Sequence, residues 1–171
     1  MRTLKIILFF AFCLSSFAIY SQTTTAEDFV RRGKNKGQLE DYHGAIIDFT
    51  KAIAINPEYA EAHFSRGFAQ HKLGDYKIAI ENYDKAISLK SDYAEIYQNR
   101  GVSKFSLRDF KGALEDYTNA IKYKKDYPIA YFSRGLTKIK LSQTDSACED
   151  LRKVLSLGYK QAEELIKKIC D

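Results

Sequence analysis

The sequence predicts an all-α protein in which pairs of helices stack into a solenoid. A segment beginning at Asp41, DYHGAIIDFTKAIAINPEYAEAHFSRG, returns in related form at Asp75 and Asp109, so the chain repeats every 34 residues. Within each repeat, apolar residues recur at spacings of one, three and four, the period of an amphipathic helix. No window shows the sustained apolar–polar alternation of a strand. A fixed period of this length is typical of a helical repeat array.

Residues 1–21 have the composition of a secretory signal peptide. Two positive charges lie within 1–5, an almost wholly apolar run occupies 6–20, and polar residues follow from Ser21. The apolar run has 15 residues, whereas a membrane-spanning helix needs about 20. We predict cleavage after Ser21, a short linker over 22–25, and a mature protein in the periplasm or outside the cell that does not insert into a membrane. Retention as an anchor and burial as an ordinary helix are the alternatives.

The charge pattern gives no indication of a nucleic-acid partner. Cleavage would remove Arg2 and Lys5 and lower the formal net charge from +5 to +3. In the remaining chain, Lys and Arg alternate with Asp and Glu along the expected helices, as on solvated faces. A nucleic-acid-binding protein needs basic residues clustered in a stripe, and the sequence shows no such cluster.

Four repeats account for nearly all of the chain after the linker. The period places them at 26–59, 60–93, 94–127 and 128–161, and leaves a capping helix over 162–171. In the second repeat we expect helices over 61–73 and 76–89, separated by Gly74 and Asp75. Pro57, Ser91 and Gly158 stand where second helices must end.

Columns of small residues predict close contact between the helices of each repeat. A glycine inside a helix costs about 1 kcal/mol relative to alanine, so glycine at position 8 of all four repeats requires a reason. Close helix–helix approach provides one, supported by alanine at position 20 and a large residue at position 24. The glycines are Gly33, Gly67, Gly101 and Gly135; the alanines are Ala45, Ala79, Ala113 and Ala147; the large residues are Phe49, Tyr83, Tyr117 and Leu151.

These columns, with an aromatic residue at position 4, alanine at position 27 and proline at position 32, resemble the tetratricopeptide repeat (TPR) family over 26–161. The resemblance implies a right-handed superhelical solenoid and a non-enzymatic scaffold that binds another protein. The sequence departs from the family at several positions. Position 7 is Arg instead of Leu, position 11 is Lys or Gln instead of Tyr, His63 replaces an aromatic residue, and only Pro57 retains the proline.

The resemblance also implies where a partner would bind. In this family the first helices line a concave groove, which suits an extended peptide or a helix with hydrophobic anchors. The expected groove residues are Phe64, Phe68, His71, Lys72, Gln98, Val102, Phe105, Phe132, Leu136 and Ile139. The groove should be polar at its N-terminal end and apolar at its C-terminal end. Packing of single aromatic residues between neighbouring first helices is the alternative for each of them.

The residues at the positions that bind a C-terminal carboxylate in this family do not match its pattern. Some family members bind the C-terminal carboxylates of cytosolic chaperones through a Lys–Asn–Asn–Lys–Arg pattern, but the matching positions here are Val30, Lys34, Ser65, Glu95 and Asn99. That partner is therefore not expected. The main alternative to a groove-binding scaffold is a structural subunit of an envelope or secretion assembly that uses its edge or convex face.

A column of arginines at position 7 accompanies a column of acids at position 23. The arginines are Arg32, Arg66, Arg100 and Arg134, and the acids are Asp48, Asp116 and Asp150, with Asn82 in the second repeat. The preferred interpretation is a structural Arg–Asp ladder that bridges the paired helices. The alternative is a row of guanidinium groups offered to an acidic ligand.

Cys148 and Cys170 are predicted to form a disulfide. Cys13 would leave with the signal peptide, and the two remaining cysteines each lie 11 residues from Tyr159, in the turn between two expected antiparallel helices. Disulfides suit an oxidising compartment, and closing a loop of about 23 residues adds roughly 3 kcal/mol on the chain-entropy model. Two free buried thiols are the alternative.

The sequence contains no motif that indicates catalysis. Its three histidines do not form a metal-binding motif, and no nucleophile elbow or phosphate-binding glycine loop is present. We therefore predict no enzyme activity, no cofactor and no metal site. The polar ends of the array, 27–41 and 160–171, favour a self-capped monomer.

Overall fold

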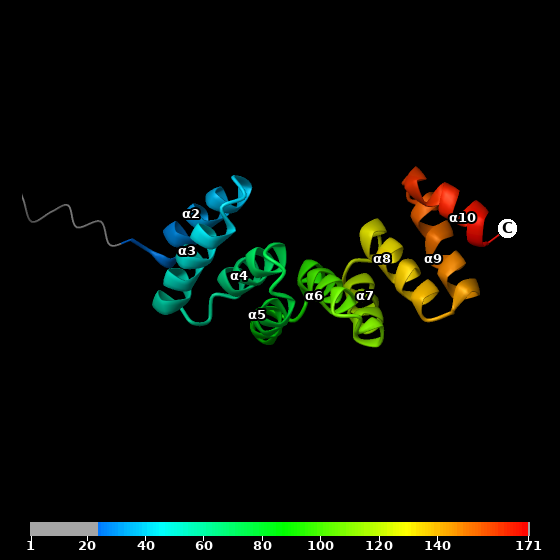
Figure 1. Ribbon diagram of the computed structural model, residues 1–171. Coiled ribbons are helices and arrows are strands. Elements are labelled where there is room, and N and C mark those ends of the chain that lie inside the picture. Colours follow the sequence, from blue (N-terminus) through cyan, green and yellow to red (C-terminus); the bar gives the residue numbers. More distant parts are fainter. Residues whose placement is uncertain (1–23, 171) are drawn as a thin grey trace, which may run out of the picture.

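The computed structural model describes residues 24–170, so the predicted signal peptide at 1–21 lies outside the described residues. Every regular element within 24–170 is helical, which confirms the predicted all-α class (Figure 1). The helices are α2 (Ala26–Gln38), α3 (Tyr42–Ile55), α4 (Ala60–Lys72), α5 (Tyr76–Leu89), α6 (Ala94–Ser106), α7 (Phe110–Tyr123), α8 (Pro128–Lys140), α9 (Thr144–Ser156), the short 3-10 helix η2 (Lys160–Ala162) and α10 (Glu163–Ile169).

Successive helix pairs stack side by side into an arch whose two ends rise on the same side (Figure 1). Each helix packs mainly on the helices before and after it in the chain, and the first helices α2, α4, α6 and α8 also contact one another in sequence. Since the first helices approach more closely than the second helices, they lie on the inner, concave side. The predicted solenoid of helix pairs is confirmed.

Local capping explains where several helices begin. Thr25, the last residue of the predicted linker, caps α2: its Oγ1 accepts from the Asp28 amide, and the Asp28 carboxylate accepts from the Thr25 amide, both at 3.2 Å. This reciprocal arrangement is a capping box. The Asp41 and Asp109 carboxylates cap α3 and α7 by accepting hydrogen bonds from the amides of Gly44 and Gly112, the third residue of each helix.

The turn inside each repeat uses a left-handed residue at position 15. The φ angles are 61° at Glu40, 87° at Gly74, 64° at Arg108 and 60° at Ser142. Glycine adopts this region without steric cost, yet only the second repeat has it. The turn is therefore set by the packing of the two helices rather than by a glycine signal in the sequence.

The glycine column lies against the large residues of position 24, as the sequence predicts. A Cβ atom added at Gly33 would lie 2.6 Å from Phe49, and one added at Gly101 would lie 2.7 Å from Tyr117. Contacts this short leave no room for a methyl group. The first and second helices of these repeats therefore touch at the glycine itself.

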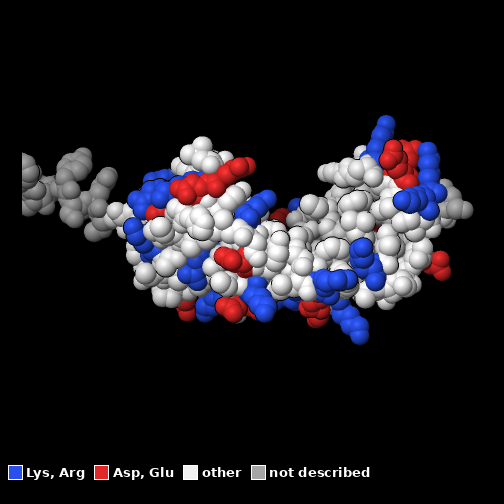
Figure 2. All heavy atoms as spheres, viewed as in Figure 1, with Lys and Arg blue, Asp and Glu red and all other residues white. Residues whose placement is uncertain are grey.

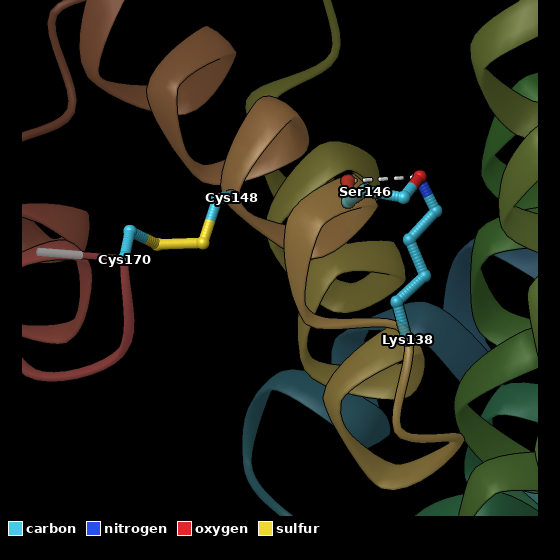
Figure 3. Close-up of a disulfide and its surroundings, with 4 residues drawn as sticks. All are labelled: Lys138, Ser146, Cys148 and Cys170. Carbon is cyan, nitrogen blue, oxygen red and sulfur yellow. Dashed lines mark hydrogen bonds between the residues drawn. A yellow bond between two sulfur atoms is a disulfide. The ribbon is translucent and has the colours of Figure 1, made fainter.

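The C-terminal end is closed by a disulfide between Cys148 on α9 and Cys170 after α10 (Figure 3). Their Cα atoms lie 5.8 Å apart, and α10 packs on α9 through Leu151, Val154 and Ile166. The capping helix is shorter than the predicted 162–171, because Lys160–Ala162 forms a 3-10 turn before α10 begins.

Candidate functional site

A cavity of about 400 Å³ lies on the concave side between α2, α4 and α6. Its apolar walls come from Phe49 of α3 and from Phe64 and Phe68 of α4. Gly33 and Gly37 face the same space from α2 and carry no side chain, which leaves it open. The complete lining is Gly33, Lys34, Gly37, Gln38, Tyr42, Ala45, Phe49, Phe64, Ser65, Phe68, Ala69, Tyr93, Glu95 and Asn99.

The aromatic walls are held by their neighbours. The Phe64 ring centre lies 5.9 Å from that of Tyr83 and 6.0 Å from that of Tyr93, the second in an edge-to-face arrangement. Such pairs are favourable beyond simple burial. Phe68 is 39% exposed, with the Lys72 ammonium 5.3 Å from its ring centre. Phe64 therefore forms a fixed wall, whereas Phe68 is available to a ligand.

Polar groups of both signs surround the opening. Lys34 of α2 pairs with Glu61 of α4, and Lys124 lies 3.2 Å from a carboxylate oxygen of Glu95. Asn99 lines the cavity and donates its side-chain amide to the Glu95 carbonyl at 2.7 Å. An apolar interior with a mixed polar rim is the usual arrangement of a site for a peptide side chain.

His71 and Gln98, predicted to face the groove, take part in contacts between helices instead. His71 shares a hydrogen bond of 2.9 Å with the Ser103 hydroxyl and packs against the Tyr76 ring. Gln98 is only 4% exposed and donates to the Ser133 hydroxyl at 3.1 Å, joining α6 to α8.

The C-terminal part of the predicted groove is partly buried. Phe132 and Ile139 pack against the cluster that α9 and α10 build around Leu151 and Ile166. The cavity with apolar walls lies at the N-terminal end of the groove, where the sequence predicts polar character. In this part of the array α10 packs on α9.

Three further predicted groove residues, Val102, Phe105 and Leu136, belong to α6 and α8. Val102 and Leu136 are half-buried, and the Phe105 ring packs on Phe110 with centres 5.2 Å apart. None of these residues lines the cavity.

Sequence reasoning missed three aromatic lining residues, Tyr42, Phe49 and Tyr93. It considered only the groove positions of first helices, whereas Tyr42 and Phe49 belong to α3 and Tyr93 precedes α6. The signal for Phe49 was present in the sequence, because the paired glycines at 33 and 37 uncover the face of α3 behind them.

The position-7 arginines join the two helices of a repeat. Arg32, Arg100 and Arg134 each bind both carboxylate oxygens of Asp48, Asp116 and Asp150, respectively. The Nε–Oδ2 distances are 2.8, 2.9 and 2.9 Å. Two parallel bonds from a planar guanidinium fix geometry as well as charge. The arrangement is the predicted ladder in three repeats.

A lysine at position 11 completes each of these three pairs. Lys36, Lys104 and Lys138 lie 2.8, 2.9 and 2.8 Å from the same carboxylates, and Figure 3 shows Lys138 also donating to the Ser146 carbonyl at 3.1 Å. The second repeat instead has Gln70 and Asn82, joined at 2.8 Å. The departures from the family at positions 7 and 11 therefore meet at the aspartate of position 23 in these three repeats.

The hydrogen bond from Arg32 lowers the pKa of Asp48 to about 2. Burial acts in the opposite direction, and Lys36 adds to the lowering. Since two cations hold Asp48 in its charged form, these ion pairs stabilise the folded state.

His63 has a structural role. Its Nε2 lies 2.9 Å from the Pro57 carbonyl, and in the next repeat the Tyr97 hydroxyl donates to the Ser91 carbonyl at 3.0 Å. Histidine thus replaces the aromatic residue of position 4 while keeping its bond to the turn.

Within residues 24–170, no three His, Cys, Asp or Glu side chains gather as metal ligands. No helix in that range combines the length and apolarity needed to cross a bilayer.

Basic and acidic side chains are interspersed on the face shown in Figure 2, without one continuous field of either sign. The same view shows a hollow between the raised ends of the arch. The surface thus offers shape and local charge pairs rather than a long-range attraction for one sign of charge.

Comparisons with known proteins agree with this architecture. A TPR repeat model matches residues 33–74 and 71–107, and a tetratricopeptide repeat model matches 94–127 and 129–157. The crystal structure of MamA is 25% identical over 86% of each chain, with a TM-score of 0.77. No curated protein sequence matches the chain.

Two other solved structures share the fold. The first TPR of Spaghetti (RPAP3), bound to an HSP90 peptide, is 21% identical over 72% of this chain and 98% of that one, with a TM-score of 0.69. YrrB, described as a TPR protein with an unusual peptide-binding site, is 18% identical over 86% and 76%, with a TM-score of 0.74. The stacked helix pairs and the matched repeats together show that the chain belongs to the tetratricopeptide repeat family.

Proposed function

We propose that this protein is a non-enzymatic scaffold that binds a partner protein, and that it holds an apolar side chain of the partner's peptide or helix in the cavity between α2, α4 and α6. The observation that carries the proposal is the cavity itself, walled by Phe49, Phe64 and Phe68. Its fixed walls limit the ordering cost of binding. Two proteins of the same fold, the Spaghetti domain and YrrB, are described with a peptide or a peptide-binding site.

The cavity favours an internal peptide segment over a C-terminal carboxylate. Glu95, the acidic group of the lining, is paired with Lys124. Lys34, the basic group on the opposite wall, is already paired with Glu61. The partner is therefore expected to contribute a side chain such as Leu, Ile or Phe, with polar backbone contacts at the rim.

The test is selection of binding peptides from a displayed library, followed by affinity measurements on two matched variants. Phe68→Glu places a charge at the mouth of the cavity on a partly exposed residue, whereas Ile47→Glu places one on α3, at a residue 55% exposed and outside the cavity. We expect Phe68→Glu to abolish binding and Ile47→Glu to preserve it, with unchanged helicity in both. Equal affinity of the wild type and Phe68→Glu would contradict the proposal.

One observation favours the alternative of a structural subunit in an envelope or secretion assembly. Ile47, Ile55 and Ile78 are 55%, 53% and 46% exposed and belong to the second helices α3 and α5. Exposed apolar residues on the second helices are candidates for contact with another protein. Loss of assembly in Ile47→Glu, with peptide binding intact, would support this function.

Location and oligomeric state complete the proposal. We infer that the protein acts in the periplasm or outside the cell, because residues 1–21 have the composition of an export signal. We infer that it is a monomer, because both ends of the repeat array, 27–41 and 160–171, are polar. A cysteine pair also suits an oxidising compartment. Fractionation of cells and N-terminal sequencing of the mature chain test the location, and light scattering tests the monomer.

A further inference from the structure

The second repeat differs from the others in the groups around its position-7 arginine. Arg66 Nε donates to the neutral side-chain oxygen of Asn82 at 2.9 Å, and Arg66 Nη1 donates to the Thr50 hydroxyl at 3.3 Å. In the other three repeats the equivalent arginine binds a buried aspartate. Among residues 24–170, no carboxylate lies within ion-pairing distance of Arg66.

The surrounding side chains do not replace the missing negative charge. Asn82 directs its amide nitrogen to Gln70 at 2.8 Å and to the Ile78 carbonyl at 3.0 Å, so only its oxygen faces Arg66. Arg66 is half-buried, and burial lowers its pKa, whereas the bond to Asp48 raises the pKa of Arg32. A partly desolvated cation without a counter-charge is unfavourable, so the site favours an anion from outside the chain.

The neighbouring ionisable groups supply no negative charge either. His63 is 6% exposed, and its Nδ1 has no hydrogen-bond partner among the described residues. Burial lowers the pKa of His63, and the positive charges of Arg66 and Lys85 lower it further. Two cations and a buried imidazole thus share this part of α4 and α5.

We propose that Arg66 binds a carboxylate that this chain does not supply, the side chain of an Asp or Glu of a partner protein. The three other repeats hold a carboxylate at the same guanidinium, which identifies the chemistry that fits. Arg Nη2, which contacts the aspartate in those repeats, has no partner at Arg66 within the described residues. Arg66 does not line the cavity, so this site is independent of the groove.

The test uses nuclear magnetic resonance of the arginine Nε–Hε groups in the purified protein. The probe is a short capped peptide with one glutamate, compared with the same peptide carrying glutamine, at constant ionic strength. The glutamate peptide should shift the Arg66 signal saturably, whereas the glutamine peptide should not. The Arg100 and Arg134 signals should stay in place, because their guanidinium groups are already bound to aspartate.

A variant that supplies the missing charge provides the decisive control. Asn82→Asp combined with Gln70→Lys reproduces the arrangement of the other three repeats. This double variant should bind the glutamate peptide about tenfold or more weakly than the wild type, since the internal carboxylate occupies Arg66. It should also raise the midpoint temperature of thermal unfolding. Its added stability excludes unfolding as the cause of the lost binding. Arg66→Gln should lose binding as well.

Three results would overturn the proposal. The first is a double variant that binds the glutamate peptide as tightly as the wild type. The second is an equal shift of the Arg66 signal by the glutamate and glutamine peptides. The third is a shift produced by inorganic phosphate while the glutamate peptide leaves Arg66 unmoved, which would replace the carboxylate with a phosphate group.

Discussion

Arg100 binds both carboxylate oxygens of Asp116, with Nε–Oδ2 and Nη2–Oδ1 distances of 2.9 and 2.5 Å, and so ties α6 to α7. Its third nitrogen, Nη1, reaches Asp84 at 2.5 Å and extends the contact to α5 of the preceding repeat. One side chain therefore fixes both the geometry within a repeat and the stacking between repeats.

We predict that Asp116→Ala destabilises the protein by about 3–5 kcal/mol, because it leaves Arg100 and Lys104 without their buried partner. Asp84→Ala is the matched control: its side chain is 54% exposed, and such pairs contribute less than about 1 kcal/mol. Urea denaturation measures both changes. Equal losses in the two variants would show that burial does not decide the strength of the pair.

The pH dependence of stability should report Asp48. Because its folded pKa is about 2, below the unfolded value of about 3.9, its contribution is complete above about pH 4 and is lost as the pH falls toward 2. We expect about 1–2 kcal/mol, reduced by solvent screening at Arg32. Unfolding free energies of the wild type and Asp48→Asn from pH 6 to 2 measure the effect. The variant should lack this part of the acid dependence, and parallel curves would contradict the assignment.

Alanine at two members of the glycine column should have opposite effects. At Gly101 a Cβ would lie 2.7 Å from the buried ring of Tyr117, so Gly101→Ala should cost about 1–3 kcal/mol through overpacking. At Gly135 the nearest atoms lie at 3.4 Å, an ordinary contact, so Gly135→Ala should gain up to about 1 kcal/mol of helix propensity. Thermal unfolding of the two variants checks the signs. The same sign in both would refute the argument from local space.

Removal of the disulfide should loosen only the C-terminal end. Cys170→Ser should destabilise that end by about 3 kcal/mol and increase amide exchange in α10. Exchange in α4 and α5 should be unchanged, because repeats contact only their neighbours. Reductant should affect the wild type and leave a Cys148→Ser, Cys170→Ser variant unaffected. Alkylation of both cysteines in the wild type without reductant would show that the bond is absent.

The fold could be predicted from the sequence because the same pattern of residues recurs in all four repeats. The expected helix over 76–89 matches α5, and the one over 61–73 differs from α4 by one residue at each end. Position 8 is glycine, position 20 is alanine and position 24 is large in every repeat. An accidental match in one repeat would not recur in the other three repeats.

The site could be predicted only in part, because it depends on where the repeats differ. Phe64 and Phe68 line the cavity as expected, but Gln98 is buried by a hydrogen bond to Ser133 of the next repeat. Phe132 and Ile139 pack, partly buried, against the cluster that α9 and α10 build, and the repeat pattern does not determine the position of α10. Contacts across repeats and at the end of the array decide which side chains remain open, and neither follows from the period.

The covalent tie at one end gives the array a direction of unfolding. The Cys148–Cys170 bond secures the last helix pair, whereas α2 at the other end is held by a capping box and by packing on its neighbours. In a chain of units that contact only adjacent units, fraying then starts at the untied terminus. The cavity includes α2, so an occupant there would clamp the end that opens first. The partner and the disulfide would thus each stabilise one end of the array against unfolding.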